Sequence, residues 1–101
     1  MKGYRERVYI IKDILILLGN VGELSLTNLL SYCGLNYLKH KSLIDELEEK
    51  GLIEKRVEER GKRKVTVYRI TNRGLRFCYK VLEPYEEMFP RKGRRMVNFV
   101  T

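Results

Sequence analysis

Residues 52–74 read LIEKRVEERGKRKVTVYRITNRG, and the order of elements in this segment constrains the fold of the whole chain. Residues 52–57 and 65–70 both read as strands, because β-formers such as Val65, Val67 and Ile70 alternate with other residues. Gly61 lies between the two strands and supplies the turn of a hairpin. Bases outnumber acids over residues 54–64. The sequence therefore predicts a β-hairpin with a basic tip.

Two helices are expected before the hairpin. Ser25 is a suitable N-cap for a short helix over residues 26–31, and Cys33-Gly34 forms the turn that follows. A second helix runs over residues 36–50 and ends at Gly51. At about 100° per residue its core face carries His40, Leu43, Ile44 and Leu47. The outward face is then formed by Leu38, Lys41, Ser42, Asp45 and Glu49, with Lys39 on the flank.

Longer apolar helices flank this region on both sides. The first spans residues 5–18 and ends at 19–22, and the last begins near Asn72, is capped by Thr71 and ends near Phe89. Pro84 predicts a kink or break near Glu83. Both helices are apolar over more of their circumference than one buried stripe requires. We therefore expect a dimer interface that includes Ile10, Ile14, Leu17, Tyr79, Leu82, Tyr85 and Phe89.

The order of elements is helix, short extended link at 23–24, helix, turn, helix, strand, basic turn, strand, helix. This is the order of a winged helix-turn-helix, a mainly α fold with a small β-hairpin (α+β). We expect one domain over residues 1–90, with a dimerisation helix at about 71–89, and a basic tail over 91–101. Two interpretations of the tail stay open: a disordered grip on phosphates, or a strand over residues 96–100 against a partner.

Composition identifies the class of partner. The chain has 101 residues, with 21 Lys and Arg against 13 Asp and Glu, a net charge of +8. Such a charge favours polyanions. The longest apolar run, 14–18, is far shorter than the ~20 residues of a membrane span, and no signal peptide is recognisable. Cys33 and Cys78 suit two buried thiols in a reducing compartment. These features predict a cytoplasmic, nucleoid-associated protein.

Double-stranded DNA is the partner that this fold and charge favour. A major groove about 12 Å wide admits one helix, here residues 36–50, while the basic wing at 58–64 reaches the adjacent backbone or minor groove. Lysine and serine side chains donate to base edges and phosphates. The residues predicted to contact DNA are Thr27, Asn28, Leu38, Lys39, Lys41, Ser42, Arg60, Lys62, Arg63 and Lys64.

Catalytic and metal-binding patterns are not recognisable. The sequence has no Ser–His–Asp or Cys–His arrangement, no glycine-rich phosphate loop and no HExxH motif, so we expect no enzymatic activity, no cofactor, no metal and no small-molecule ligand. His40 is the only histidine and suits a structural role on the core face. Tyrosines at 4, 9, 32, 37, 68, 79 and 85 are interpreted as packing residues in the core or an interface, for the most part, and not as a stacking platform for bases.

Several segments resemble archaeal winged-helix DNA-binding proteins of the ten-a type, a family of chromatin proteins and regulators. The matching pieces are Leu26-Thr27-Asn28-Leu29-Leu30-Ser31-Tyr32, Leu35-Asn36-Tyr37, Leu47 with Gly51-Leu52-Ile53, and Tyr68-Arg69-Ile70-Thr71-Asn72-Arg73-Gly74-Leu75-Arg76-Phe77. The resemblance implies a DNA-binding dimer joined by a long, straight last helix in an antiparallel coiled coil. This chain differs in two respects: Asn28 stands where the family usually has Arg, and Pro84 interrupts the last helix. A more compact dimer built from the first and last helices is the alternative.

Three functions therefore compete. The first is a homodimeric transcriptional regulator with two recognition helices about 34 Å apart. The second is a chromatin protein of the same fold with little sequence preference, favoured by Asn28 and by the acidic second half of helix 36–50. The third is a protein-interaction module that uses the apolar surface of the first and last helices. Regulation leads by a narrow margin.

Overall fold

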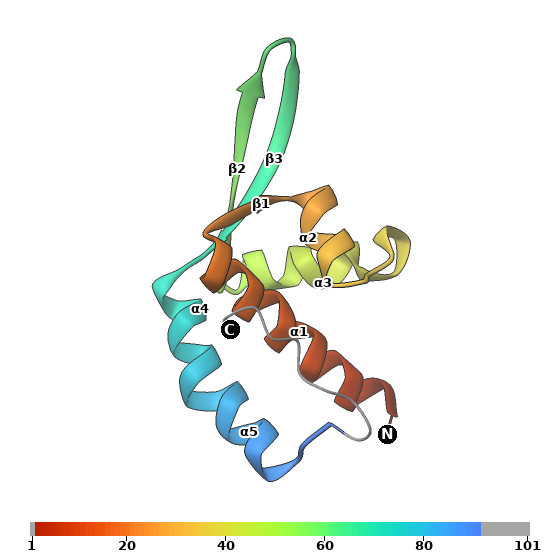
Figure 1. Ribbon diagram of the computed structural model, residues 1–101, viewed down its shortest axis with the longest axis vertical. Helices are drawn as coiled ribbons and strands as arrows, with labels where there is room; N and C mark the ends of the chain where they lie inside the picture. The colour runs from red at the N-terminus through yellow and green to blue at the C-terminus, as the bar shows by residue number, and fades with distance from the viewer. Residues whose placement is uncertain (1, 92–101) are drawn as a thin grey trace.

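The computed structural model describes residues 2–91, and side chains from residue 7 onward. Its elements in chain order are α1 (Lys2–Val21), β1 (Glu23–Ser25), α2 (Leu26–Tyr32), α3 (Tyr37–Glu49), β2 (Ile53–Arg60), β3 (Arg63–Ile70), α4 (Asn72–Phe77), the π-helical η1 (Cys78–Leu82) and α5 (Glu83–Met88). Figure 1 shows a helical body from which the β2–β3 hairpin projects. The predicted fold class, a winged helix-turn-helix of the α+β type, is confirmed.

Side-chain caps set the starts of α2 and α3. Ser25 accepts a hydrogen bond from the backbone N–H of Asn28 at 3.2 Å, as a residue at the N-cap does. Asn36 caps α3 in the same way, since its Oδ1 accepts from Lys39 N–H at 3.1 Å. In return, the N–H of Asn36 donates to Nδ1 of His40 at 3.2 Å. His40 is half-buried, and through this hydrogen bond it supports the N-terminal cap of α3.

The first helix is longer than the predicted span of 5–18. α1 continues through Gly19 to Val21, because Gly19 keeps helical backbone angles. The helix ends at Gly22, whose φ of 97° is open to glycine and strained for other residues. The predicted extended link at 23–24 pairs with β3 and forms the third strand of the sheet.

The three strands form an antiparallel sheet in the order β1-β3-β2. Both hairpin strands run further than predicted, and the ladder continues to the pair Arg60↔Arg63. Gly61, with φ 66°, and Lys62 make a two-residue turn of the kind that fits the twist of a hairpin. Because the turn is this short, the charged residues on either side of the Gly61–Lys62 turn belong to strands and not to a loop.

A tight corner joins α3, β2 and α4. Thr71 caps α4 by accepting from Gly74 N–H at 3.0 Å, and its hydroxyl donates to the carbonyl of Gly51 at 2.6 Å. Gly74 lies so close to this corner that a Cβ there would stand 2.1 Å from the carbonyl oxygen of Leu52. The predicted cap at Thr71 is confirmed.

One core joins the inner faces of all these elements. The fully buried side chains of α1, α2 and α3 meet those of the sheet and η1. The core comprises Ile14, Leu15, Leu17, Leu18, Leu29, Leu30, Leu43, Ile44, Leu47, Leu52, Ile53, Tyr68, Cys78 and Leu82. The inner face predicted for residues 36–50 is confirmed by Leu43, Ile44 and Leu47.

The last helix is irregular where the sequence predicts a kink or break. Cys78–Leu82 adopts π-helical geometry, with Glu83 N–H donating to the carbonyl of Cys78, and α5 begins immediately afterwards with Pro84 in its first turn. A proline lacks the backbone donor and needs space for its ring, and the wider π turn precedes it. The helix therefore changes geometry near Glu83 without ending there, and Met88 is its last residue.

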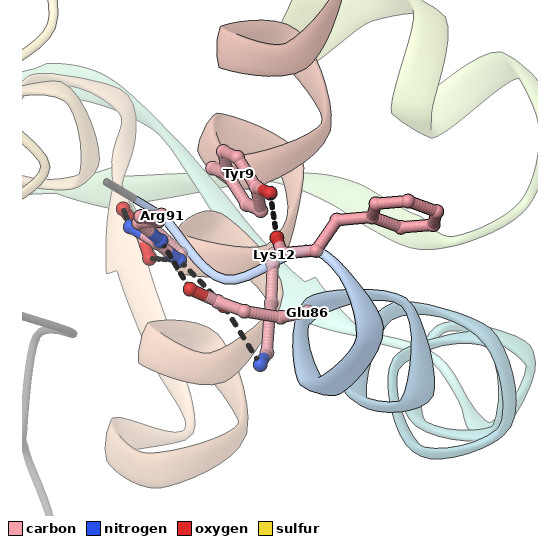
Figure 2. Close-up of polar contacts among 6 residues, drawn as sticks. Tyr9, Lys12, Glu86 and Arg91 are labelled. Atoms are coloured by element: carbon pink, nitrogen blue, oxygen red, sulfur yellow. Dashed lines mark hydrogen bonds and ion pairs between the residues drawn. The ribbon is translucent and has the colours of Figure 1, made fainter.

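The chain after α5 returns to α1 through a cluster of charged side chains, shown in Figure 2. Arg91 donates to both carboxylate oxygens of Asp13, at 3.0 and 2.9 Å, and to Glu86 at 2.7 Å. Lys12 contacts the other Glu86 oxygen at 3.0 Å. The Arg91 side chain is 4% exposed, so it belongs to the folded body. The predicted tail boundary at 90/91 is wrong for Arg91, and residues 92–101, including the predicted strand at 96–100, lie outside the described residues.

Candidate nucleic-acid interface

The outer surface of α3 is the central part of the candidate interface. Leu38 is 90% exposed, and Lys39 and Ser42 are exposed beside it. The core holds the opposite face of the helix through Leu43 and Leu47. A leucine this exposed at the start of a recognition helix is positioned for apolar contact with a partner, because nothing in the described part of the chain covers it.

Lys41 differs from its neighbours on α3. Its Nζ lies 2.7 Å from Oδ1 of Asp45, one helical turn further on, and its side chain is half-buried. The hydrogen bond to Asp45 raises the pKa of Lys41. A lysine already paired with a carboxylate gains less from a phosphate than a lysine without such a partner. The exposed lysine of the outer α3 surface without an acidic partner among residues 7–91 is therefore Lys39.

Two of the predicted DNA-contact residues lie at the start of α2. Thr27 and Asn28 are both exposed in the first turn of α2. The backbone N–H of Asn28 is occupied by the Ser25 cap, but its side-chain amide makes no hydrogen bond among residues 7–91. Both side chains are therefore available to an external partner.

The basic residues of the wing form two groups: those with an acidic partner in the described part of the chain and those without one. Glu58 accepts hydrogen bonds from Arg56 at 2.6 Å and from Arg60 at 2.9 Å. These hydrogen bonds hold the pKa of Glu58 below its usual value, and the bond from Arg56 has the larger effect. Arg60 is thus internally paired. The tip residues Lys62, Arg63 and Lys64 are exposed and have no ion-pair partner among residues 7–91.

The strand register assigns these residues to the two faces of the hairpin. Lys64 pairs with Glu59 and shares a face with Lys55, whose Nζ lies 3.7 Å from Glu48 of α3. Arg60 and Arg63 are directly opposite each other on the other face. Lys64 is therefore on the α3 side of the wing, while Arg63 points to the opposite side.

An exposed helix face beside a projecting hairpin is the arrangement of a winged helix-turn-helix. A family model described as winged helix-turn-helix matches residues 4–89. The chain belongs to this winged helix-turn-helix family. Domains of this type indicate DNA binding and are typically without enzymatic activity. A search of curated proteins finds no significant match.

The described residues also bear on metal binding, membrane spans and thiol reactivity. Among the described residues, no three His, Cys, Asp or Glu side chains are grouped so that they would hold a metal ion. No helix in that part of the chain combines the length and apolar character of a membrane span. Burial raises the pKa of Cys33 to about 12, so this thiol stays protonated and unreactive near neutral pH.

Exposed tyrosines of this winged helix-turn-helix protein are residues that the sequence analysis did not assign to the interface. Tyr32 at the end of α2 and Tyr37 at the start of α3 are 59% and 53% exposed, and Tyr79 is exposed as well. Of the tyrosines described, Tyr68 is buried in the core, and Tyr9 and Tyr85 are half-buried and pack against each other, in agreement with a packing role. The predicted role of the exposed tyrosines in packing at an interface stays a prediction. Tyr37 could have been assigned to the candidate interface from the sequence, because it directly precedes the exposed Leu38.

The predicted dimer residues fall into two sets. Ile14, Leu17 and Leu82 are buried in the protomer's own core, so they cannot form a surface for a second copy, and that part of the prediction is wrong. Ile10 and Tyr85 are half-buried, and Tyr79 and Phe89 are exposed. Tyr85 stacks between Tyr9 and Phe89, with ring centroids 6.2 and 5.1 Å away. Val81 of η1 and Met88 of α5 were not among the predicted dimer residues, and both are exposed.

Proposed function

We propose that this protein binds double-stranded DNA as a homodimer and regulates transcription. In this proposal α3 enters the major groove and the wing follows the adjacent backbone. The observation that carries it is the pairing of an exposed α3 face with a wing tip whose cations, Lys62, Arg63 and Lys64, have no acidic partner among residues 7–91. The family match over residues 4–89 supports the DNA-binding part of this proposal.

The two parts of the interface suit different components of a duplex. Lys39 and Ser42 of α3 suit base edges and phosphates, and Leu38 suits a thymine methyl group. The wing cations suit phosphates, which position a protein without reading sequence. Thr27 and Asn28 lie at the start of α2, where they suit the backbone beside the groove.

A second copy is expected on the last helix. Val81, Tyr85 and Met88 recur at spacings of four and three residues, which places them along one side of the helix. Val81 and Met88 are 46% and 72% exposed, so the stripe is apolar and largely uncovered in the protomer. A dimer built on this stripe places two α3 helices on one duplex.

Salt-dependent titration tests DNA contact by the wing. Lys64→Gln and Arg69→Gln each remove one positive charge from β3, but the register puts the two residues on opposite faces of the hairpin. We expect Lys64→Gln to reduce the slope of log K against log salt by about 0.9 for each protomer of the dimer, the loss of one phosphate contact per protomer. Arg69 already pairs with Glu54 at 3.4 Å, so Arg69→Gln should leave the slope unchanged. Equal effects of both would contradict the proposed orientation of the wing.

A chromatin protein with little sequence preference is the second candidate. The Lys41–Asp45 pair removes one cation from the reading face of α3, and Asn28 stands where the ten-a type usually has arginine. Both features weaken base readout relative to backbone contact.

Comparing the protein's own promoter region with random duplex separates these candidates. A preference of ~10³-fold or more supports a specific regulator. Equal affinity for the two duplexes supports chromatin packaging. An absence of binding to either at low salt would contradict both, and would favour the use of the fold as a protein-interaction module.

A further inference from the structure

A groove lies behind the recognition helix, between the end of α3 and the last helix. It has a volume of about 620 Å³. Leu52 and Phe77 line it with apolar surface, and four cationic side chains surround them: Lys50, Arg73, Arg76 and Lys80. Arg73, Arg76 and Lys80 recur at spacings of three and four residues, which places them along one side of the α4–η1 helix.

A smaller cavity of about 200 Å³ adjoins this groove and shares Lys50, Leu52 and Phe77 with it. The cavity extends between α1 and α3, where Val8, Ile11, Leu43 and Leu47 give it an apolar lining and the Arg7–Glu46 ion pair adds the charged residues. Leu43 and Leu47 belong to the inner face of α3, opposite the exposed Leu38 and Ser42. The two spaces together offer a cationic opening and an apolar interior on the side of α3 that faces away from the proposed DNA surface.

The walls of the groove are held firmly. The Thr71 hydroxyl donates to the carbonyls of Gly51 and Leu52, at 2.6 and 3.0 Å, which ties the α3–β2 corner to the start of α4. The absence of a side chain at Gly74 lets α4 approach this corner closely. The groove is therefore preformed, and filling it requires little ordering of the backbone.

The charge of the groove is positive, and of its four cations Lys50 alone has an acidic partner among residues 7–91. Among the described lining residues of both cavities, Glu46 is the only acid. It is already paired with Arg7 and Lys50, and the hydrogen bond from Arg7, followed by that from Lys50, holds the pKa of Glu46 below its usual value. Arg73, Arg76 and Lys80 have no ion-pair partner among residues 7–91.

We propose that this groove binds an amphipathic organic anion, a carboxylate or sulfonate carried on an aromatic or aliphatic body. The anionic group pairs with Arg76 and Lys80 at the opening, and the apolar body lies over Leu52 and Phe77. Small-molecule sites commonly combine an apolar lining with a few convergent polar groups in this way. A DNA phosphate fits less well, because a duplex presents charge without an apolar body to fill the interior. The proposal does not depend on DNA binding.

The test measures binding to the full chain in the absence of DNA, by amide chemical shifts. Three probes separate charge from apolar body: 2-naphthoate, the neutral 2-naphthylmethanol and inorganic phosphate. We expect 2-naphthoate to bind at least about tenfold more tightly than either control and to shift the amides of Gly51, Leu52 and Phe77. The double variant Arg76→Gln/Lys80→Gln should weaken naphthoate binding about tenfold. Both side chains lie at an exposed surface, so the fold should be retained.

A variant of equal charge change controls for net charge. Lys55→Gln/Arg69→Gln also removes two positive charges, from the sheet and away from the groove, and should leave naphthoate affinity unchanged. Equal weakening by both double variants would overturn the proposal in favour of nonspecific charge attraction. Phosphate binding as tight as naphthoate would overturn it in favour of a second nucleic-acid surface. Shifts confined to Val81, Tyr85 and Met88 would overturn it in favour of the apolar stripe on the last helix.

Discussion

Arg91 fixes the end of the last helix to α1 through a bidentate contact with Asp13 and a further contact with Glu86. Its guanidinium also lies 4.8 Å from the centre of the Tyr9 ring, and the Tyr9 hydroxyl donates to the carbonyl of Phe89. Burial alone would lower the pKa of Arg91, but its hydrogen bonds to the two carboxylates outweigh burial and raise it. The arginine is thus charged whenever the protein is folded.

Removing Arg91 should destabilise the fold strongly. Arg91→Ala removes a cation from two largely buried carboxylates, of which Glu86 keeps its contact with Lys12, and the expected loss is about 3 kcal/mol in the free energy of unfolding. Arg63→Ala, at the exposed wing tip, is the matched control and should change stability by less than about 0.5 kcal/mol. Urea unfolding measures both. Similar values for the two variants would show that the Arg91 contacts are energetically neutral.

Glu86 gives this cluster a pH dependence. Burial raises the pKa of Glu86 on its own, but hydrogen bonds from Arg91 and Lys12 outweigh it and hold the pKa below its usual value. A carboxylate with a depressed folded pKa stabilises the fold fully above its unfolded pKa, about 4.3, and loses this effect as the pH falls through the folded value. Glu86→Gln should therefore cost about 1–3 kcal/mol at pH 7, and the difference from wild type should shrink below about pH 4.

Stability curves over pH 3–7 measure this difference. Glu87→Gln serves as the control, because Glu87 is exposed on the same turn of α5. A gap between wild type and Glu86→Gln that stays constant across this range would contradict the assigned ionisation.

Two helical glycines allow a steric comparison. A Cβ at Gly74 would stand 2.1 Å from the carbonyl oxygen of Leu52, whereas a Cβ at Gly19 would meet Leu75 at an ordinary 3.7 Å. Gly74→Ala should therefore cost about 2 kcal/mol or more by forcing α4 away from the corner. Gly19→Ala should be neutral or stabilise the protein by up to about 1 kcal/mol, because alanine favours the helix. Thermal unfolding of both variants tests the close approach.

At the residue scale, features that depend on near neighbours could be predicted from the sequence. The caps at Ser25 and Thr71 and the turn at Gly61 involve partners within three residues. Arg91 could not be predicted in this way, since Asp13 lies 78 positions earlier. The adjacent charges Lys12 and Asp13 within an apolar helix were the available signal, because buried charges require partners.

At the scale of elements, the hairpin shows why strand lengths were underestimated. Residues 58–64 are mostly charged, and charged residues are uncommon in strands. The tip of the hairpin extends beyond the body, so both of its faces are exposed to solvent and carry charges at little cost (Figure 1). Pairs such as Arg60–Glu58 then replace apolar packing along the exposed ribbon.

Shortening the wing tests the role of this element. Deleting Glu59, Arg60, Arg63 and Lys64 removes two cross-strand pairs and leaves the Gly61–Lys62 turn between Glu58 and Val65. Removing an even number of pairs keeps each remaining residue on its face of the hairpin. We expect stability to change by less than about 0.5 kcal/mol, and the salt slope of DNA binding to fall by about 2 for each protomer of the dimer. An unchanged slope in a folded variant would exclude the wing from the interface.

At the scale of the whole molecule, three surfaces lie on different sides of the folded protein. The exposed face of α3 and the wing form the proposed DNA surface, the cationic groove lies behind α3, and the apolar stripe lies on the last helix. The sequence predicted which face of α3 is exposed, because helical periodicity determines which face is buried, and Leu43, Ile44 and Leu47 are buried as expected. It predicted the stripe poorly, because the π turn at 78–82 changes which residues of the last helix face α1.

The stripe determines the expected oligomeric state. Val81→Glu/Met88→Glu places two carboxylates on a surface that a second copy is proposed to cover, and burying such charges without partners is costly. We therefore expect the wild type to sediment as a dimer and this variant as a folded monomer. Val57→Glu, at an equally exposed valine of the wing, should remain dimeric.

DNA binding by the same variants links the oligomeric state to function. A monomer presents a single α3 to the duplex, so its salt slope should be about half that of the wild-type dimer. A wild type that sediments as a monomer at all concentrations would contradict the dimer. A Val81→Glu/Met88→Glu variant that stays dimeric would instead place the interface elsewhere, because two buried carboxylates on the stripe are incompatible with a stable contact there.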